Sequence, residues 1–98
     1  MKLRLARRAL ADAKRLKTWW RENRPAAPDL FSDELNTALE QIASKPNIGT
    51  LYEQGNLDVP VRRLLLPKTK NHVYYAVHDD MIVVVSIWGA PKERGPTL

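Results

Sequence analysis

The chain has 98 residues and a formal net charge of +5, with 44% hydrophobic and 28% charged residues. These values fit one small soluble domain and argue against a disordered chain. Cysteine is absent and histidine occurs twice, so disulfide scaffolds and cysteine nucleophiles are excluded, and we expect neither a metal nor a cofactor. The sequence shows neither an apolar stretch of membrane-spanning length nor the apolar core of a secretory signal, so we expect a cytoplasmic protein.

The charge is distributed in three blocks along the chain. Residues 1–24 hold nine basic and two acidic side chains, residues 28–58 hold one basic and six acidic, and residues 59–98 hold six basic and three acidic. Such blocks indicate a polarised surface that attracts an acidic partner, either a nucleic acid or a protein. The alternative interpretation is a first helix whose solvated face is rich in Lys and Arg.

The first half of the chain predicts one strand and two helices. Residues 2–5 alternate basic and apolar side chains, which is the period of a half-buried strand. From about residue 7 the apolar spacing becomes four, three and four, which predicts a helix that ends before Pro25 and Pro28. A second helix is expected over residues 29–44. The two apolar faces consist of Ala9, Ala13, Leu16 and Trp20, and of Phe31, Leu35, Ala38 and Ile42.

The second half predicts a loop over residues 49–60, then three strands at 61–66, 72–78 and 81–88. Asp79 and Asp80 fit a tight hairpin turn between the last two strands. Alternation predicts which side chains share a face: Val73, Tyr75 and Val77 against His72, Tyr74, Ala76 and His78, and Met81, Val83, Val85 and Ile87 against Ile82, Val84, Ser86 and Trp88. Because both faces of the last strand are apolar, we expect it inside the sheet, with helices on one side and another element covering the other.

These elements predict a single α+β domain over residues 1–98. An N-terminal strand and a two-helix hairpin pack on a small antiparallel sheet, in the order β-α-α-β-β-β. Residues 89–98 have no hydrophobic period and are expected to form a flexible tail or C-terminal arm.

Four segments, spread over nearly the whole chain, carry a family resemblance. Residues 3–12 enter a helix through an Ala-x-x-Asp step, and residues 46–49 form a Pro-x-x-Gly loop. Residues 61–77 hold an Arg-x-Leu run followed by Val-Tyr-Tyr, and residues 82–90 form a closing apolar strand. In this order they resemble the RelE/ParE family, the toxins of bacterial type II toxin–antitoxin pairs. The resemblance implies a cognate antitoxin and a toxin–antitoxin hetero-oligomer.

The family has two branches with different targets. ParE-like members poison DNA gyrase and stall replication, whereas RelE-like members cleave messenger RNA on the ribosome, which needs a base, an acid and cations. For cleavage the chain could offer Arg63, His72 and Arg94, but neither Tyr nor His follows position 78. The resemblance therefore favours a ParE-like gyrase inhibitor without enzymatic activity of its own. The alternative is a ribosome-dependent mRNA endoribonuclease.

The residues expected to meet partners form two sets. An apolar groove flanked by basic residues would suit an acidic, amphipathic antitoxin segment. The set expected to bind the target is Arg62, Arg63, Lys68, Lys70, Tyr74, Trp88, Lys92 and Arg94, and the set expected to bind the antitoxin is Leu16, Trp19, Trp20, Ile82 and Val84. Structural alternatives are an ion pair between one of the two adjacent arginines and the second helix, and core positions for Trp20, Trp88 and one of the two adjacent tyrosines.

Two hypotheses lie outside the toxin interpretation. The first is a small nucleic-acid-binding domain that uses the basic first helix and the Tyr-bearing sheet, and salt-dependent binding without toxicity would support it. The second is a non-toxic assembly module whose apolar strand is an oligomer interface. A well-formed homo-oligomer without an effect on growth would support that one.

Overall fold

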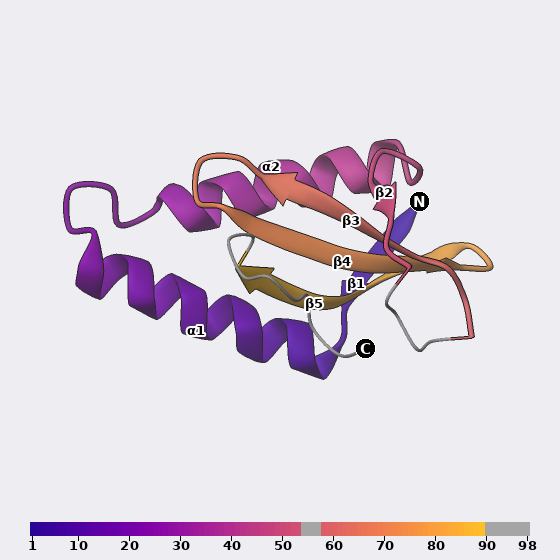
Figure 1. Cartoon of the computed structure of the whole chain (residues 1–98), viewed down its shortest axis with the longest axis horizontal. Coiled ribbons are helices and arrows are strands. Elements are labelled where there is room, and N and C mark those ends of the chain that lie inside the picture. Colours follow the sequence, from indigo (N-terminus) through magenta and orange to yellow (C-terminus); the bar gives the residue numbers. More distant parts are fainter. Residues whose placement is uncertain (54–57, 90–98) are drawn as a thin grey trace.

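Two helices and a five-stranded sheet make up the described part of the chain, residues 1–53 and 58–89 of a computed structural model (Figure 1). The elements are β1 (Lys2–Leu5), α1 (Arg7–Asn23), α2 (Leu30–Ser44), β2 (Thr50–Leu51), β3 (Val61–Leu66), β4 (Asn71–His78) and β5 (Met81–Gly89). The α+β class and the order of the predicted elements are confirmed. The short β2 lies inside the segment expected to be a loop.

The strands are arranged in the order β1-β5-β4-β3-β2. The meander of β3, β4 and β5 is antiparallel, as predicted, and β2 also pairs antiparallel with β3. In contrast, β1 pairs in parallel with β5, with Leu3 opposite Ile82. The sheet is therefore mixed, because α1 and α2 carry the chain between the first strand and the rest of the sheet. The interior position predicted for β5 is confirmed, since β1 and β4 flank it.

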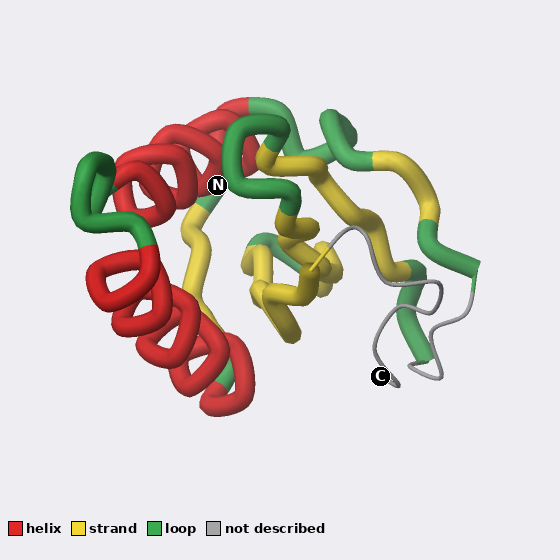
Figure 2. The backbone as a smooth tube through the Cα atoms, turned by 60° about the vertical axis from the view of Figure 1, so that its left-hand side comes forward, coloured by secondary structure: helices red, strands yellow, loops and turns green. Residues whose placement is uncertain are grey.

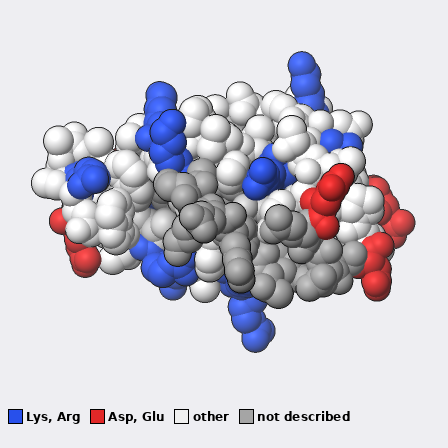
Figure 3. Space-filling model, in the orientation of Figure 1, with Lys and Arg blue, Asp and Glu red and all other residues white. Residues whose placement is uncertain are grey.

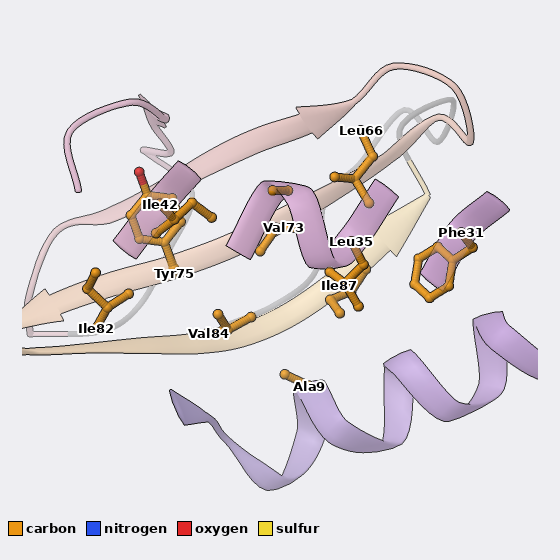
Figure 4. Close-up of a cluster of buried hydrophobic side chains, with 11 residues drawn as sticks. Ala9, Phe31, Leu35, Ile42, Leu66, Val73, Tyr75, Ile82, Val84 and Ile87 are labelled. Carbon is orange, nitrogen blue, oxygen red and sulfur yellow. The ribbon is translucent and has the colours of Figure 1, made fainter. Parts of the chain in front are cut away.

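Both helices lie on one side of the sheet, and the main core fills the space between them (Figures 2 and 4). The predicted face of α2 is confirmed, because its four apolar side chains are all buried. On α1, Ala9 is buried, and Ala13, Leu16 and Trp20 pack partly buried against the core. The period of four, three and four therefore identified the inward faces correctly.

A β-bulge changes the alternation in β5. Tyr74 pairs with Ser86 while Tyr75 pairs with Val84, so Val85 is an extra residue in the strand. The predicted alternation is wrong beyond this point: Ile87 joins the helix-side core, and Trp88 packs on the opposite face of the sheet.

Asp12 of α1 satisfies the polar groups at the bulge. Its Oδ2 accepts hydrogen bonds from the Ser86 hydroxyl and from the Ile87 amide, each at 3.0 Å. Arg15 donates to the other carboxylate oxygen at 3.0 Å. Asp12 is 5% exposed, so this contact ties the middle of α1 to β5 in the interior.

The loop after α2 is held by Tyr75, whose hydroxyl accepts from the Gly49 amide at 2.8 Å and donates to the Pro46 carbonyl at 2.7 Å. Gly49 is needed here, because an added Cβ would lie 2.8 Å from both the Arg63 carbonyl oxygen and the Tyr75 hydroxyl. Gly49 thus lets the loop lie close to Arg63 of β3, and the next two residues, β2, pair with β3.

Candidate functional site

A groove opens between the C-terminal half of α1 and the turn that joins β3 to β4. It has a volume of about 520 Å³ and is lined by Leu16, Trp19, Trp20, Arg24, Lys68, Thr69, Lys70, Asn71 and Gly89. We call it the α1 groove. The structure thus brings together three residues expected to bind the antitoxin and two expected to bind the target, Lys68 and Lys70, which the sequence had placed in separate sets.

Aromatic surface and positive charge meet in the α1 groove. Trp19 is 44% exposed, and its ring stands edge-on to that of Trp20 with centroids 5.7 Å apart. The Arg24 guanidinium lies 5.4 Å from the Trp19 ring centroid, a cation–π distance. Such a groove can receive an apolar side chain from a partner while its basic rim attracts carboxylates.

Glu34 of α2 holds the basic turn at the rim of the α1 groove. Its carboxylate accepts from the Lys68 amide at 2.7 Å, from the Thr69 amide at 3.0 Å and from the Thr69 hydroxyl at 2.7 Å. Lys70 completes the turn with a positive φ of 60°. Sequence reasoning missed Glu34, since nothing in its helix position indicates a partner 34 residues away.

The face of the sheet away from the helices carries a second group of side chains, which we call the aromatic cluster. Tyr52, Val61 and Tyr74 are buried together, with Val85 and Trp88 packed against them. The ring centroids of Tyr52 and Tyr74 are 4.7 Å apart.

Two polar side chains lie against the aromatic cluster. The Arg63 guanidinium is 5.5 Å from the Tyr52 ring centroid, and the His72 ring is 5.9 Å from that of Tyr74. Burial lowers the pKa of His72 below 6.5, and the charge of Arg63 lowers it further. Burial raises the pKa of Tyr74 above 10, against the hydrogen bond from Arg63, which acts the other way. At neutral pH, His72 is therefore uncharged and Tyr74 is protonated.

Several predicted site residues lie elsewhere. Arg62 is on the opposite side of β3 from Arg63 and donates to the Gly49 carbonyl at 2.7 Å, so it supports the loop. Ile82 and Val84 are fully buried between sheet and helices and offer no surface to an antitoxin. Tyr74 and Tyr75 are both buried, although only one was expected in the core. Lys92, Arg94 and the tail predicted beyond Gly89 fall outside the described residues.

Charge is unevenly spread over the surface. Figure 3 shows Lys and Arg atoms on the upper and lower edges and in the middle of this face, whereas the larger group of Asp and Glu atoms lies at the right-hand end, by the β4–β5 turn. Within residues 1–53 and 58–89, His, Asp and Glu form no group of three that could hold a metal ion. Among the described helices, none has the length and apolar character needed to cross a membrane.

Comparisons with known proteins identify the family. A family model described as the ParE toxin of the type II toxin–antitoxin system parDE matches residues 3–91. A solved structure of the chromosomal ParDE system from P. aeruginosa superposes with a TM-score of 0.61 and 20% sequence identity, covering 91% of this chain and 95% of that one, which shows a shared fold. No curated protein sequence matches the chain. Since the family model spans most of its length, the chain belongs to the ParE toxin family of type II toxin–antitoxin systems.

Proposed function

We propose that this protein inhibits DNA gyrase in the bacterial cytoplasm and is neutralised by a cognate antitoxin. The observation that carries the proposal is the match to the ParE toxin family over residues 3–91. Family membership alone does not establish a target. The proposal therefore also depends on whether the described surfaces suit binding to a target or catalysis.

The aromatic cluster favours inhibition by binding over catalysis. RNA cleavage through a 2′-hydroxyl needs a general base and a general acid that both reach the substrate. Tyr74 is 1% exposed and its pKa is raised, so in this conformation its hydroxyl cannot serve as a surface acid. Arg63, partly exposed beside it, remains suited to contact an acidic target surface.

RNA cleavage is the second candidate function, and one observation favours it. Arg63 and His72 lie on the same face of the sheet, and the lowered pKa of His72 keeps the imidazole available as a base at neutral pH. Replacing both by Gln would abolish cleavage if this pair carried it.

One experiment separates the two candidates. The full chain is added to purified gyrase in a DNA supercoiling reaction, and in parallel it is induced in bacteria while DNA breaks and messenger RNA are followed. Gyrase inhibition predicts lost supercoiling and DNA breaks with intact messages. The double variant Arg63→Gln, His72→Gln should weaken these effects, because Arg63 is the cation proposed to contact the target. Rapid loss of translated messages with unimpaired supercoiling would refute gyrase as the target.

The α1 groove is the proposed antitoxin site. Its exposed Trp19 and its basic rim fit an acidic amphipathic segment, whose apolar side chains would enter the groove. We expect Trp19→Ala to weaken antitoxin binding about 30-fold, because a buried aromatic anchor contributes about 2 kcal/mol or more to an interface. Calorimetric titration with the antitoxin, sought as a small acidic reading frame beside the gene, measures this. Leu51→Ala is the matched control, since Leu51 is 57% exposed on the edge strand β2; equal losses in both variants would refute the assignment.

A further inference from the structure

The solvent-facing side of α1 carries a regular row of cations that neither the core nor the α1 groove uses. Arg7, Lys14 and Arg21 follow one another at intervals of seven residues and are all exposed. On a helix, residues seven apart lie within about 20° of one another, so these side chains project in nearly one direction. The buried Ala9 lies on the other side of the helix. We call these three residues the α1 cation row.

The cations of this row are not balanced by carboxylates. Over the described part of the chain, the ion pairs are Arg15 with Asp12 and His78 with Asp79, so neither involves the row. The small residues Ala11 and Thr18 lie on one flank of the row, and Leu10 and Lys17 lie on the other, all of them exposed. The row is therefore a positive strip whose charge is not neutralised within residues 1–53 and 58–89.

The N-terminal end of the row does not favour the helix itself. Arg7 is the first residue of α1, the first turn holds no acidic residue, and the N-cap residue Ala6 makes no side-chain hydrogen bond to the helix. A cation at a helix N-terminus is repelled by the helix dipole and by the unpaired amide groups there. Arg21, by contrast, lies in the last turn, where the helix dipole favours a cation. Helix stability thus explains Arg21 but gives no reason for Arg7, and a partner that binds the row would.

The chemistry of the row fits phosphate better than protein. Cores of protein–protein interfaces are depleted in Lys and depend on aromatic anchors. On α1 both tryptophans line the α1 groove, and only Trp19 also borders a hollow shared with Lys14 of the row. Lys and Arg on an exposed helix suffice for phosphate contacts, which need no shape-specific pocket. The 14 residue steps from Arg7 to Arg21 span about 21 Å along the axis, which is the rise of roughly six base pairs.

We propose that the α1 cation row binds the phosphate backbone of duplex DNA without sequence preference. The major groove of B-form DNA, about 12 Å wide, admits an α-helix, whereas the major groove of A-form RNA is too narrow for protein side chains to read. This binding is a property of the toxin chain and does not depend on gyrase being its target.

The test compares the full chain with the triple variant Arg7→Gln, Lys14→Gln, Arg21→Gln. Binding to a short fluorescein-labelled DNA duplex of arbitrary sequence is followed by anisotropy between about 50 and 200 mM salt. Each lost phosphate contact lowers the slope of log affinity against log salt by about 0.9, so the triple variant should lose about 2.7. The corresponding loss of affinity is roughly 10²- to 10³-fold at 0.1 M salt.

A matched control removes three exposed cations away from α1, in the variant Lys2→Gln, Arg4→Gln, Lys45→Gln. The control should keep the wild-type slope and affinity within a factor of about two to three, and an equal loss in both triple variants would overturn the proposal. Thermal unfolding of the row variant should be nearly unchanged, because the gain from removing a cation at the helix N-terminus offsets the loss of Arg21 in the last turn. This result would exclude misfolding as the cause of lost binding.

Two further probes identify the occupant. Tighter binding of duplex DNA than of an RNA duplex of equal length supports the B-form groove, and equal binding overturns that assignment. Polyglutamate that competes as well as DNA of equal charge would assign the row to an acidic protein and overturn the proposal. Because gyrase is absent from these measurements, their outcome is independent of the supercoiling experiment.

Discussion

Removing the carboxylate of Asp12 should strongly destabilise the protein, because this side chain of α1 is hydrogen-bonded to buried groups of β5. The side chain accepts hydrogen bonds from two buried donors on β5, the Ser86 hydroxyl and the Ile87 amide. Ser86 and Ile87 are both fully buried, so water cannot easily replace the lost acceptor. In Asp12→Ala the bulge in β5 is therefore left with two donors that lack a partner.

The size of the effect follows from these contacts. A buried donor left without a partner costs about 1–3 kcal/mol, and with the Ser86 hydroxyl free to rotate we expect a loss of about 3 kcal/mol in the free energy of unfolding. For a domain of this size such a loss lowers the midpoint of thermal unfolding by roughly 12–24 °C. Arg15 adds little, because its side chain is 59% exposed and exposed ion pairs contribute about 0–1 kcal/mol.

Urea unfolding of the isolated chain measures the effect, with Arg15→Ala as the control that removes only the exposed partner. A double-mutant cycle of Asp12→Ala with Ser86→Ala isolates the buried hydrogen bond, and we expect a coupling of about 1 kcal/mol. The reasoning is refuted if Asp12→Ala is no more destabilising than Arg15→Ala, or if the two changes in the cycle are additive.

The remaining predictions concern Tyr75 and His72 of β4, and Gly49 in the loop that Tyr75 holds. Tyr75→Phe should lower the free energy of unfolding by about 1–3 kcal/mol, because the buried Gly49 amide loses its acceptor and the partly buried Pro46 carbonyl loses a donor. Gly49→Ala should also destabilise the protein, because its Cβ would lie 2.8 Å from the Arg63 carbonyl oxygen. A wild-type result for either variant in urea unfolding would contradict this reasoning. The pKa of His72 is lowered from 6.5 by burial and by Arg63, so the folded state binds this proton more weakly than the unfolded state, and stability should fall as the pH drops below about 6.5. His72→Gln should remove that part of the pH dependence, whereas His78→Gln, at an exposed turn, should leave it; equal pH profiles for the two variants would count against burial of His72 as the cause.

The sequence predicted the parts of the fold that depend on hydrophobic period. The inward faces of both helices and the interior position of β5 follow from the spacing and number of apolar residues. The bulge does not, because Val83, Val84 and Val85 have equal hydrophobicity and alternation cannot show which one is extra. The contact that accompanies the bulge, with Asp12, crosses more than 70 residues of sequence. The two-residue period of β1 likewise does not indicate whether this strand pairs in parallel or antiparallel with β5.

The candidate site was predicted in pieces. Trp19 and Trp20 were assigned to an antitoxin and Lys68 and Lys70 to a target, yet all four line the α1 groove. Their meeting depends on where α1 ends relative to the β3–β4 turn, and the hydrogen bonds from that turn to Glu34 help to determine its position. Both are tertiary contacts that no local pattern encodes.

α1 thus presents different chemistry on different sides. Its C-terminal half contributes the tryptophans of the α1 groove, while Arg7 and Lys14 project from the side opposite the core. A segment seated in the groove would cover Trp19, two residues from Arg21 of the row, without reaching Arg7, about 18 Å away along the helix axis. On the two proposals above, the antitoxin and DNA would therefore compete at the Arg21 end of the row, while Arg7 would stay accessible to DNA. We expect the neutralised complex to bind DNA more weakly than the free toxin, and not to lose this binding altogether.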